Sequence, residues 1–326
     1  MINYNEIFNI KSVKEFEKYS IEIFKYQFQN NNIYRKFCKL TGKNIENIKS
    51  SYEIPFLPIQ FFKTHKIISS EKKIKKIFQS SGTTKSALSK HYIVDLKLYE
   101  ECFNKIFIET YGDPSKYNII ALLPTYLENK NSSLIYMINN LIQKSNNIHS
   151  GFYLNNYKEL KKKLLHLEKG NKKTILFGVS YALLNLIDYH KFNLNNTIII
   201  ETGGMKGIKE EIIKNELHQK LQLGFGVENI HSEYGMTELM SQAYSLKNQK
   251  FKCPKWMKIY IREKEDPMTI MTNNKSGGIN IIDLANYNSC SFIATDDIGL
   301  INKEGDFEIL GRLDYSDQRG CNLLIE

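Results

Sequence analysis

Short apolar runs that alternate with amphipathic segments constrain the fold of this chain more than any other feature of its sequence. From about residue 75 onward, apolar runs rich in Ile and Leu predict buried strands at 118–123, 174–177 and 197–200. Segments with helical periodicity lie among them, at 131–144, 156–169 and 206–222. Because strands that alternate with helices usually pair in parallel, the pattern predicts an α/β fold with mainly parallel sheets flanked by helices.

The two ends of the chain differ from this middle part. Residues 1–50 predict amphipathic helices, because apolar side chains recur there at roughly helical spacing: Phe16, Tyr19, Ile23, Tyr26 and Phe37. Two prolines at 54–58 end this pattern and begin an extended segment. After about residue 250 the sequence predicts shorter strands, ending with 292–295 and 306–310, and a loop at 270–278.

Composition excludes several classes of protein. The net charge is +10, but only four of the 45 basic residues are arginine, and the lysines are spread along a chain that is also rich in Asn and Ile. The excess of lysine is typical of a compositional bias, so we expect no nucleic-acid partner.

No run of about 18 apolar residues and no signal-peptide pattern is present, so we expect a cytoplasmic protein without a membrane span. Five cysteines without a CxxC pair argue against a disulfide framework or a structural zinc site.

A phosphate-binding segment is predicted at 78–84, where a short apolar strand runs into small hydroxylated residues. Backbone N–H groups and hydroxyls of such a segment can face a phosphate chain, here from Ser80, Ser81, Gly82, Thr83 and Thr84. The Gly-Lys-Ser/Thr ending of a Walker loop is absent. A polar turn without a ligand is the alternative interpretation.

Two further segments follow predicted apolar runs. At 201–207, a glycine pair after a strand lets a ligand approach the backbone closely, although a helix start is the alternative. At 232–238, Tyr234 can stack on a base, and Thr237 and Glu238 can hold a phosphate oxygen and a magnesium ion. The alternative for this second segment is a helix N-cap with acidic residues in its first turn.

The last two motifs lie near the end of the chain. Paired aspartates at 294–299 are expected to end a strand, where they could be simple turn formers. Arg312 and Arg319 are two of the four arginines, and in a lysine-biased chain they indicate places that need a planar, bidentate donor.

Taken in order, these motifs resemble those of the adenylate-forming superfamily of acyl and aryl acid ligases. They read SSGTT (80–84), TGGMKG (202–207), YGMTE (234–238), TDD (295–297) and GRLD (311–314) followed by RG. Longer runs are similar to the acyl-protein synthetase (LuxE-type) family, namely LLPTYLE, HSGFYL, FGVS, ETGGMKG, HSEYGMTELMSQAYS and SDQRGCNLL. That family supplies fatty acyl groups to a reductase, and the resemblance covers nearly the whole chain.

The resemblance implies ATP and Mg²⁺ as cofactors and assigns roles to individual residues. The residues Ser80, Ser81, Gly82, Thr83 and Thr84 would wrap the triphosphate, and Gly203, Gly204, Tyr234 and Gly235 would border the adenine. Thr237 would contact the α-phosphate, Glu238 would hold magnesium, Asp297 would bind the ribose, and Arg312 would face the ribose or phosphate. An acyl pocket would be lined by Phe177, Gly178, Val179 and Ser180.

The resemblance also implies three parts: an N-terminal helical segment (1–50), an adenylate-forming core (51–310), and a short hinge and tail (311–326). The superfamily's C-terminal lid domain with its catalytic lysine is expected to be missing. The hinge is one residue shorter than in the superfamily, so neither Asp314 nor Asp317 is assigned as its pivot.

Transfer of the acyl group to a cysteine is the second implied step. Cys321 is the expected acceptor, and the neighbouring Arg319 would favour its thiolate. Cys253 is the main rival, and Cys290 is expected to be buried. Expected partners are a fatty or other carboxylic acid and an acyl reductase or other acceptor protein. A ligase resembling the acyl-CoA and aryl-CoA ligases, or a non-catalytic nucleotide-binding scaffold for a reductase, remain alternatives.

Overall fold

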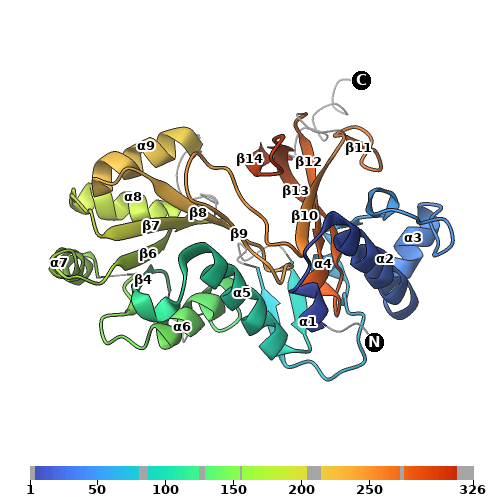
Figure 1. Ribbon diagram of the computed structural model, residues 1–326, viewed down its shortest axis with the longest axis horizontal. Helices are drawn as coiled ribbons and strands as arrows, with labels where there is room; N and C mark the ends of the chain where they lie inside the picture. The colour runs from blue at the N-terminus through green and yellow to red at the C-terminus, as the bar shows by residue number, and fades with distance from the viewer. Residues whose placement is uncertain are drawn as a thin grey trace, which may run out of the picture.

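Two sheets, joined through a central layer of helices and loops, make up the computed structural model (Figure 1). It describes residues 4–80, 87–124, 129–154, 156–203, 214–271 and 275–313. The predicted segment Ser81–Thr84 and the residues Gly204, Arg319 and Cys321 lie outside the described ranges, as do Asp314 and Asp317.

The first sheet has the order β5–β4–β6–β7–β8–β9, in which only β9 is antiparallel to its neighbour. Its strands are β4 (Asn118–Leu122), β5 (Gly151–Phe152), β6 (Thr174–Val179), β7 (Thr197–Thr202), β8 (Ile230–Tyr234) and β9 (Ala243–Ser245). The three strands predicted at 118–123, 174–177 and 197–200 are therefore confirmed, and they are neighbours in space.

Helices cover both faces of this sheet. One face packs against α7 (Tyr157–Leu167), α8 (Ser180–Tyr189) and α9 (Lys214–Phe225), and the other against α5 (Leu96–Tyr111) and α6 (Ser133–Ser145). Successive side chains of β4 point to opposite faces of the sheet. Ile120 and Leu122 belong to one apolar cluster, and Ile119 and Ala121 belong to the other. Burial on both faces explains why these strands read as continuous apolar runs.

The second sheet has the order β1–β13–β12–β10–β11, with β14 paired to the other part of β13. All of its pairs are antiparallel except that between β1 and β13. Its strands are β1 (Leu57–Pro58), β10 (Met257–Arg262), β11 (Ile270–Met271), β12 (Gly277–Asp283), β13 (Phe292–Ile301) and β14 (Phe307–Arg312). The predicted α/β fold is confirmed, with one mainly parallel and one mainly antiparallel sheet.

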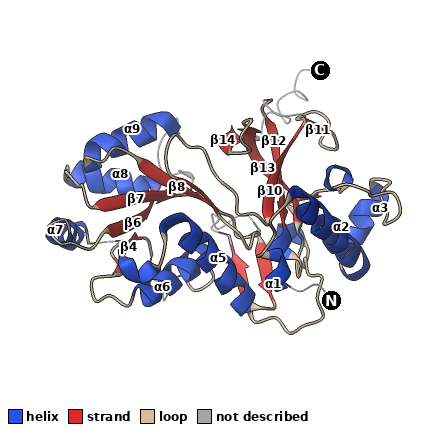
Figure 2. Cartoon of the chain, viewed as in Figure 1, coloured by secondary structure: helices blue, strands red, loops and turns tan. Residues whose placement is uncertain are grey.

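The N-terminal helices α1 (Tyr4–Ile7), α2 (Val13–Asn30) and α3 (Asn32–Leu40) confirm the amphipathic pattern of residues 1–50. In Figure 2, α2 and α3 lie on the outer side of the second sheet. The ring of Phe292 in β13 packs against those of Phe24 and Tyr34, at centroid distances of 6.3 and 5.8 Å. The N-terminal segment is therefore part of the main core and not a separate appendage.

The remaining elements are short. They are η1 (Ser51–Glu53), α4 (Phe61–Thr64), η2 (Pro114–Lys116), η3 (Leu284–Asn286) and a separate hairpin of β2 (Lys76–Gln79) and β3 (Lys90–Ile93). The strand predicted just before the phosphate-binding segment is confirmed as β2. Phe78 of β2 lies opposite His91 of β3, and both side chains are buried, so one face of the hairpin packs into the protein.

Three predictions about local structure were wrong. The paired aspartates do not end a strand, because Asp296 and Asp297 lie in the middle of β13. No helix begins at 232–238: Ser232, Glu233 and Tyr234 end β8, and turns follow, which removes the N-cap alternative. The expected loop at 270–278 contains β11 and the start of β12. The glycines at 277–278 do not mark a loop there, because they leave room for the backbone and side chain of Arg262 in the neighbouring strand.

Candidate nucleotide site

Two of the predicted motifs lie side by side at the carboxyl ends of parallel strands. In the register of β7 and β8, Glu201 pairs with Ser232 and Thr202 pairs with Glu233, so Gly203 and Tyr234 follow at the same edge. Ligands of α/β sheets bind at the carboxyl ends of their strands. The sheet therefore brings the TGG and YGMTE motifs together where a nucleotide is expected.

The backbone at Gly203 is open to a ligand. Its φ of +77° is in the left-handed region, and a Cβ built there would meet no atom of the described residues within 4 Å. The hydroxyl of Ser180 donates to the Gly203 carbonyl oxygen at 2.9 Å and to Oε2 of Glu201 at 3.1 Å, which fixes the turn. This geometry fits a planar ligand lying against the turn.

The buried carboxylate of Glu201 holds together the elements around the Gly203 turn. Oε1 of Glu201 lies 3.2 Å from Nζ of Lys214 and 3.8 Å from Nε2 of His218, and it accepts a hydrogen bond from Ser232 at 3.2 Å. Burial alone would raise the pKa of Glu201, but the ammonium of Lys214 and the imidazole of His218 lower it to about 2. Glu201 is thus ionised at neutral pH and joins α9 to the ends of β7 and β8.

The tyrosine of YGMTE and the second aspartate of TDD are in direct contact. Oη of Tyr234 donates to Oδ2 of Asp297 at 2.7 Å, which connects the parallel sheet to the antiparallel one. Nε of Arg312, in β14, lies 3.4 Å from Oδ1 of Asp297, and its Nη2 lies 3.8 Å from Oδ2 of Asp296. Three residues predicted from separate motifs therefore form one polar cluster.

Aromatic rings fix the orientation of Tyr234. Its ring makes edge contacts with Phe251 and Phe307, at centroid distances of 5.9 and 5.4 Å, and those two rings stack on each other. Nζ of Lys214 lies 4.9 Å from the ring centroid of Phe251. Tyr234 remains partly exposed, and its stacking on a base stays a prediction.

Glu233 is a feature that the sequence reasoning missed. Its side chain is buried, and it accepts a hydrogen bond from Oγ1 of Thr202 at 2.6 Å. Burial raises the pKa of Glu233 to about 7, and the nearby carboxylate of Glu201 acts in the same direction, while the Thr202 hydroxyl opposes both. No motif identified Glu233, because only the strand register places it next to Thr202.

The loop after Tyr234 is held by Asp283, the last residue of β12. Oδ2 of Asp283 accepts hydrogen bonds from the backbone N–H groups of Met240 and Ser241, each at 2.9 Å, and Oδ1 accepts from the Ser241 hydroxyl at 2.7 Å. Thr237 remains partly exposed in this loop, and Glu238 is buried. The hydrogen bonds to Asp283 therefore hold the loop in place, and Thr237 is partly exposed on it.

Ser80 is the one residue of the predicted phosphate-binding segment that the structure describes. Its N–H donates to the Ser89 carbonyl at 3.1 Å, and its hydroxyl accepts from the Ser89 N–H at 3.0 Å. The base of the segment is thus closed as a hairpin between β2 and β3. Contacts from Ser81, Gly82, Thr83 and Thr84 stay predictions.

The predicted acyl-pocket residues do not share one environment. Phe177 is fully buried in the core, and a Cβ at Gly178 would lie 2.7 Å from the side chain of Leu183. Ser180 is buried and fixes the Gly203 turn, so only Val179 is partly exposed. The role of this segment in acyl binding stays a prediction. The hydroxyl of Ser180 is instead hydrogen-bonded to the carbonyl oxygen of Gly203.

The cysteines differ in their access to solvent. Cys38, Cys102 and Cys290 are fully buried, as predicted for Cys290, and Cys253 is partly exposed. Burial raises the pKa of Cys38 to about 12 and also raises the pKa of Cys253 and Cys290. Since the thiolate is the nucleophile, none of these thiols is set up for attack at neutral pH.

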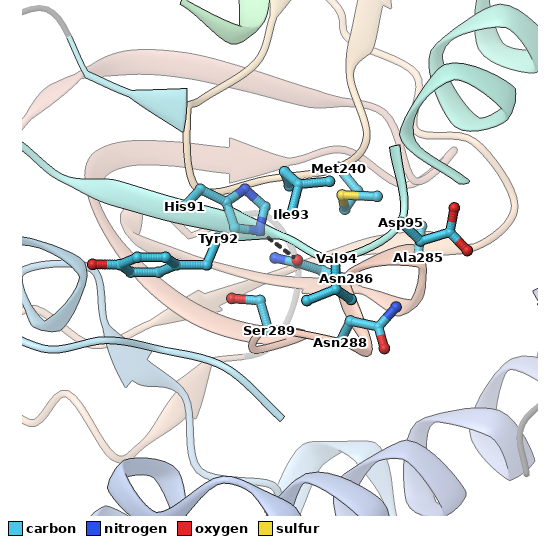
Figure 3. Close-up of a pocket in the computed structure, with 10 residues that line it drawn as sticks. All are labelled: His91, Tyr92, Ile93, Val94, Asp95, Met240, Ala285, Asn286, Asn288 and Ser289. Carbon is cyan, nitrogen blue, oxygen red and sulfur yellow. Dashed lines mark hydrogen bonds between the residues drawn. The ribbon is translucent and has the colours of Figure 1, made fainter. Parts of the chain in front are cut away.

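A small cavity lies between β3, Met240 and the η3 region (Figure 3). Its volume is about 10 Å³, close to the lower limit for one water molecule, so it cannot hold a nucleotide or an acid. Among the described residues, no group of three His, Cys, Asp or Glu side chains is arranged to hold a metal ion. None of the described helices is long and apolar enough to cross a membrane.

Solved structures of acid ligases share this fold. An open form of 2-hydroxyisobutyryl-CoA ligase, in complex with 2-HIB-AMP and CoA, matches with a TM-score of 0.68 and 11% identity over 93% of this chain and 70% of that ligase. ATP-bound MatB from Rhodopseudomonas palustris matches with a TM-score of 0.56 and 14% identity over 74% of this chain and 49% of MatB. The aligned region thus spans about half of MatB. The fold is that of the adenylate-forming ligases.

The family follows from the sequence comparison. The family model described as acyl-protein synthetase, LuxE, matches residues 9–326. A long-chain-fatty-acid–luciferin-component ligase from Vibrio harveyi is 23% identical, over 92% of this chain and 84% of its own length. The chain therefore belongs to the acyl-protein synthetase (LuxE) family. This confirms the resemblance drawn from the motifs and the expected class of enzyme, a ligase.

Proposed function

We propose that this protein uses ATP to convert a carboxylic acid, of the long-chain fatty acid class, to an acyl-adenylate and then transfers the acyl group to a protein cysteine. The observation that carries the proposal is the cluster of Tyr234, Asp297 and Arg312 beside the open Gly203 turn. The substrate class is taken from the family description and from the name of the Vibrio harveyi relative.

In the first step, a carboxylate oxygen of the acid attacks the α-phosphorus of ATP, and pyrophosphate leaves. Alignment of two anions and neutralisation of the phosphate oxygens are the main tasks of the protein. Gly203 and Tyr234 would border the adenine, Asp297 would accept the ribose hydroxyls, and Thr237 would donate to an α-phosphate oxygen. Arg312 is half exposed and would face the ribose or phosphate.

A magnesium ion is compatible with the residues present. Mg²⁺ in nucleotide sites is commonly held by one or two carboxylates together with substrate phosphates. Glu238 is the carboxylate of the Thr237–Glu238 loop, and it would supply that protein ligand. The ion would neutralise charge on the phosphate oxygens when bound.

In the second step, a cysteine thiolate attacks the acyl carbonyl carbon, AMP leaves, and a thioester forms. We propose Cys321 as the acceptor, because each of the four other cysteines has a raised thiol pKa through burial. Arg319 would favour the thiolate of Cys321. An acyl reductase or another acceptor protein would then receive the acyl group, in a cytoplasmic setting.

The test is ATP–pyrophosphate exchange with Mg²⁺ and a panel of acids from acetate to tetradecanoate, together with aryl acids. Exchange that depends on long-chain acids would support the proposal. No exchange with any acid, with or without an acyl reductase, would overturn it in favour of a nucleotide-binding scaffold. Release of acyl-CoA on adding CoA, without covalent labelling of the protein, would instead indicate a CoA ligase.

A pair of cysteine variants tests the second step. Cys321→Ser should keep pyrophosphate exchange and lose covalent labelling by radioactive acid, whereas Cys253→Ser should keep both activities. Full labelling of the Cys321 variant would remove Cys321 from the mechanism.

A further inference from the structure

We propose that His91 is a positioning residue that ties the loop of Thr237 and Glu238 to the hairpin of the phosphate-binding segment. The inference rests on the proposed function, because the loop needs a fixed position only if it contacts nucleotide and metal. His91 is neither adjacent to these residues in sequence nor part of a recognised motif. It acts through the loop backbone and touches no reacting atom.

The contacts of His91 converge on the loop. Its ring is buried, with Nδ1 2.8 Å from the carbonyl oxygen of Thr237 and Nε2 2.9 Å from Oδ1 of Asn286 (Figure 3). Asn286, in η3, continues the link, because its Nδ2 donates to the carbonyl oxygen of Glu238 at 2.8 Å. One histidine and one asparagine thus bind two successive carbonyl groups of the loop.

Binding two successive carbonyls fixes the loop more strongly than one contact would. Each peptide unit is planar, so holding its oxygen also sets the direction of the chain on both sides. With the carbonyls of Thr237 and Glu238 both held, the directions in which their side chains leave the backbone are restricted. Catalytic groups must be held within a fraction of an ångström of the productive geometry, and a misplacement of about 1 Å can cost roughly 100-fold in rate.

The other end of the link is the hairpin. His91 lies opposite Phe78 in the β2–β3 register, two residues from the Ser80–Ser89 closure at the base of the phosphate-binding segment. A displacement of β3 would therefore move both the phosphate-binding segment and the loop. Through β3, the arrangement links the Ser80–Ser89 closure to the backbone of Thr237 and Glu238, the residues expected to contact the α-phosphate and magnesium.

The surroundings of His91 exclude direct contact with substrate. The cavity that it lines has a volume of only about 10 Å³, and its other walls come from β3, Met240 and the η3 region. A histidine with only a packing role would contact core side chains alone. Nδ1 of His91 instead faces the Thr237 carbonyl oxygen of the loop, and Nε2 lies beside Asn286, which itself donates to the Glu238 carbonyl oxygen.

The test compares His91→Gln, which keeps an N–H donor, with His91→Phe, which keeps an aromatic ring and loses the N–H that faces the Thr237 carbonyl oxygen. In pyrophosphate exchange, His91→Phe should raise the KM for MgATP by about tenfold or more, equivalent to about 1.4 kcal/mol, and leave the KM for the acid within about twofold. His91→Gln should fall between His91→Phe and wild type. The control is His231→Gln, which removes a partly buried histidine that contacts Tyr111.

The outcomes separate this inference from the proposed function. Failure of wild-type exchange would reject the function itself. Active wild type with unchanged KM for MgATP in His91→Phe, or equal changes in the KM for ATP and for acid, would reject the positioning role. If both His91 variants and Asn286→Ala fail to fold, by circular dichroism and thermal melting, the link is structural and the inference is also overturned.

Discussion

The hydroxyl of Tyr234 donates a 2.7 Å hydrogen bond to Oδ2 of Asp297, although the two residues are 63 positions apart and belong to different sheets. The contact leaves Oδ1 of Asp297 facing Arg312. A carboxylate held on one oxygen by a tyrosine has a restricted orientation. The predictions below follow from this cluster and from the buried carboxylates beside it.

Tyr234→Phe should weaken the binding of MgATP by about three- to tenfold with little change in the KM for the acid. The variant loses the hydrogen bond that orients the Asp297 carboxylate, whereas the aromatic contacts with Phe251 and Phe307 remain. Titration calorimetry with ATP and pyrophosphate exchange provide the measurement. Tyr26→Phe, which loses a hydrogen bond to the Ser69 carbonyl far from the site, is the matched control. Equal effects of the two variants would contradict the prediction.

Asp297→Asn should lower nucleotide affinity more than Asp296→Asn does. The side chain of Asp297 is bonded to Tyr234 and faces Arg312, whereas Asp296 accepts from Gln60 and lies farther from Arg312. We expect about a tenfold rise in the KM for MgATP for the first variant and less than about threefold for the second, which correspond to about 1.4 and 0.7 kcal/mol. A larger effect at Asp296 would reassign the ribose-binding role to that residue.

The stability of the protein should depend on the protonation of Glu233. Its pKa is raised from 4.5 to about 7 in the folded state, so the folded protein binds this proton more tightly than the unfolded chain. The associated stability is complete below about pH 4.5 and is lost as the pH rises through 7, by about 3 kcal/mol in all. Chemical denaturation at pH 5, 6, 7 and 8 measures the loss, and Glu233→Gln should reduce it. An unchanged pH slope in this variant would assign the loss to other groups.

Glu201 should have the opposite pH dependence. Its pKa is lowered to about 2, so its stabilisation is complete above about pH 4.5 and declines as the pH falls toward 2. Lys214→Met should raise this pKa and move acid unfolding to higher pH, because the buried carboxylate loses its ammonium partner at 3.2 Å. Lys220→Met, which breaks an exposed ion pair with Glu216, is the control and should change stability by no more than about 1 kcal/mol. Equal acid midpoints for both variants would reject the role of Lys214.

Gly203→Ala should impair nucleotide binding and change stability only modestly. The site has open space for a methyl group, but the backbone has a φ of +77°, which costs an alanine roughly 1 kcal/mol. The added methyl group also occupies the surface on which the adenine is expected. Differential scanning fluorimetry with and without MgATP measures both effects. An undiminished thermal shift with MgATP would place the nucleotide elsewhere.

The sequence by itself determined the α/β class, the strands at 118–123, 174–177 and 197–200, and the family, because these depend on local periodicity and on motifs read in order. It also identified Tyr234, Asp297 and Arg312 as candidates, although their direct contact was not predictable from spacing. The TDD motif was expected at a strand end, and only pairing with β14 showed that it lies within β13.

Tertiary structure alone decided which groups surround the motifs. Glu233, Asp283, His91 and Asn286 have no local signature, because a buried polar side chain is defined by partners that are distant in sequence. The β7–β8 register places Glu233 against Thr202, and the packing of η3 against β3 brings Asn286 to His91. Local sequence patterns specify the elements and the candidate ligand-binding segments, but the hydrogen bonds that hold those segments in place form only when separate elements pack together.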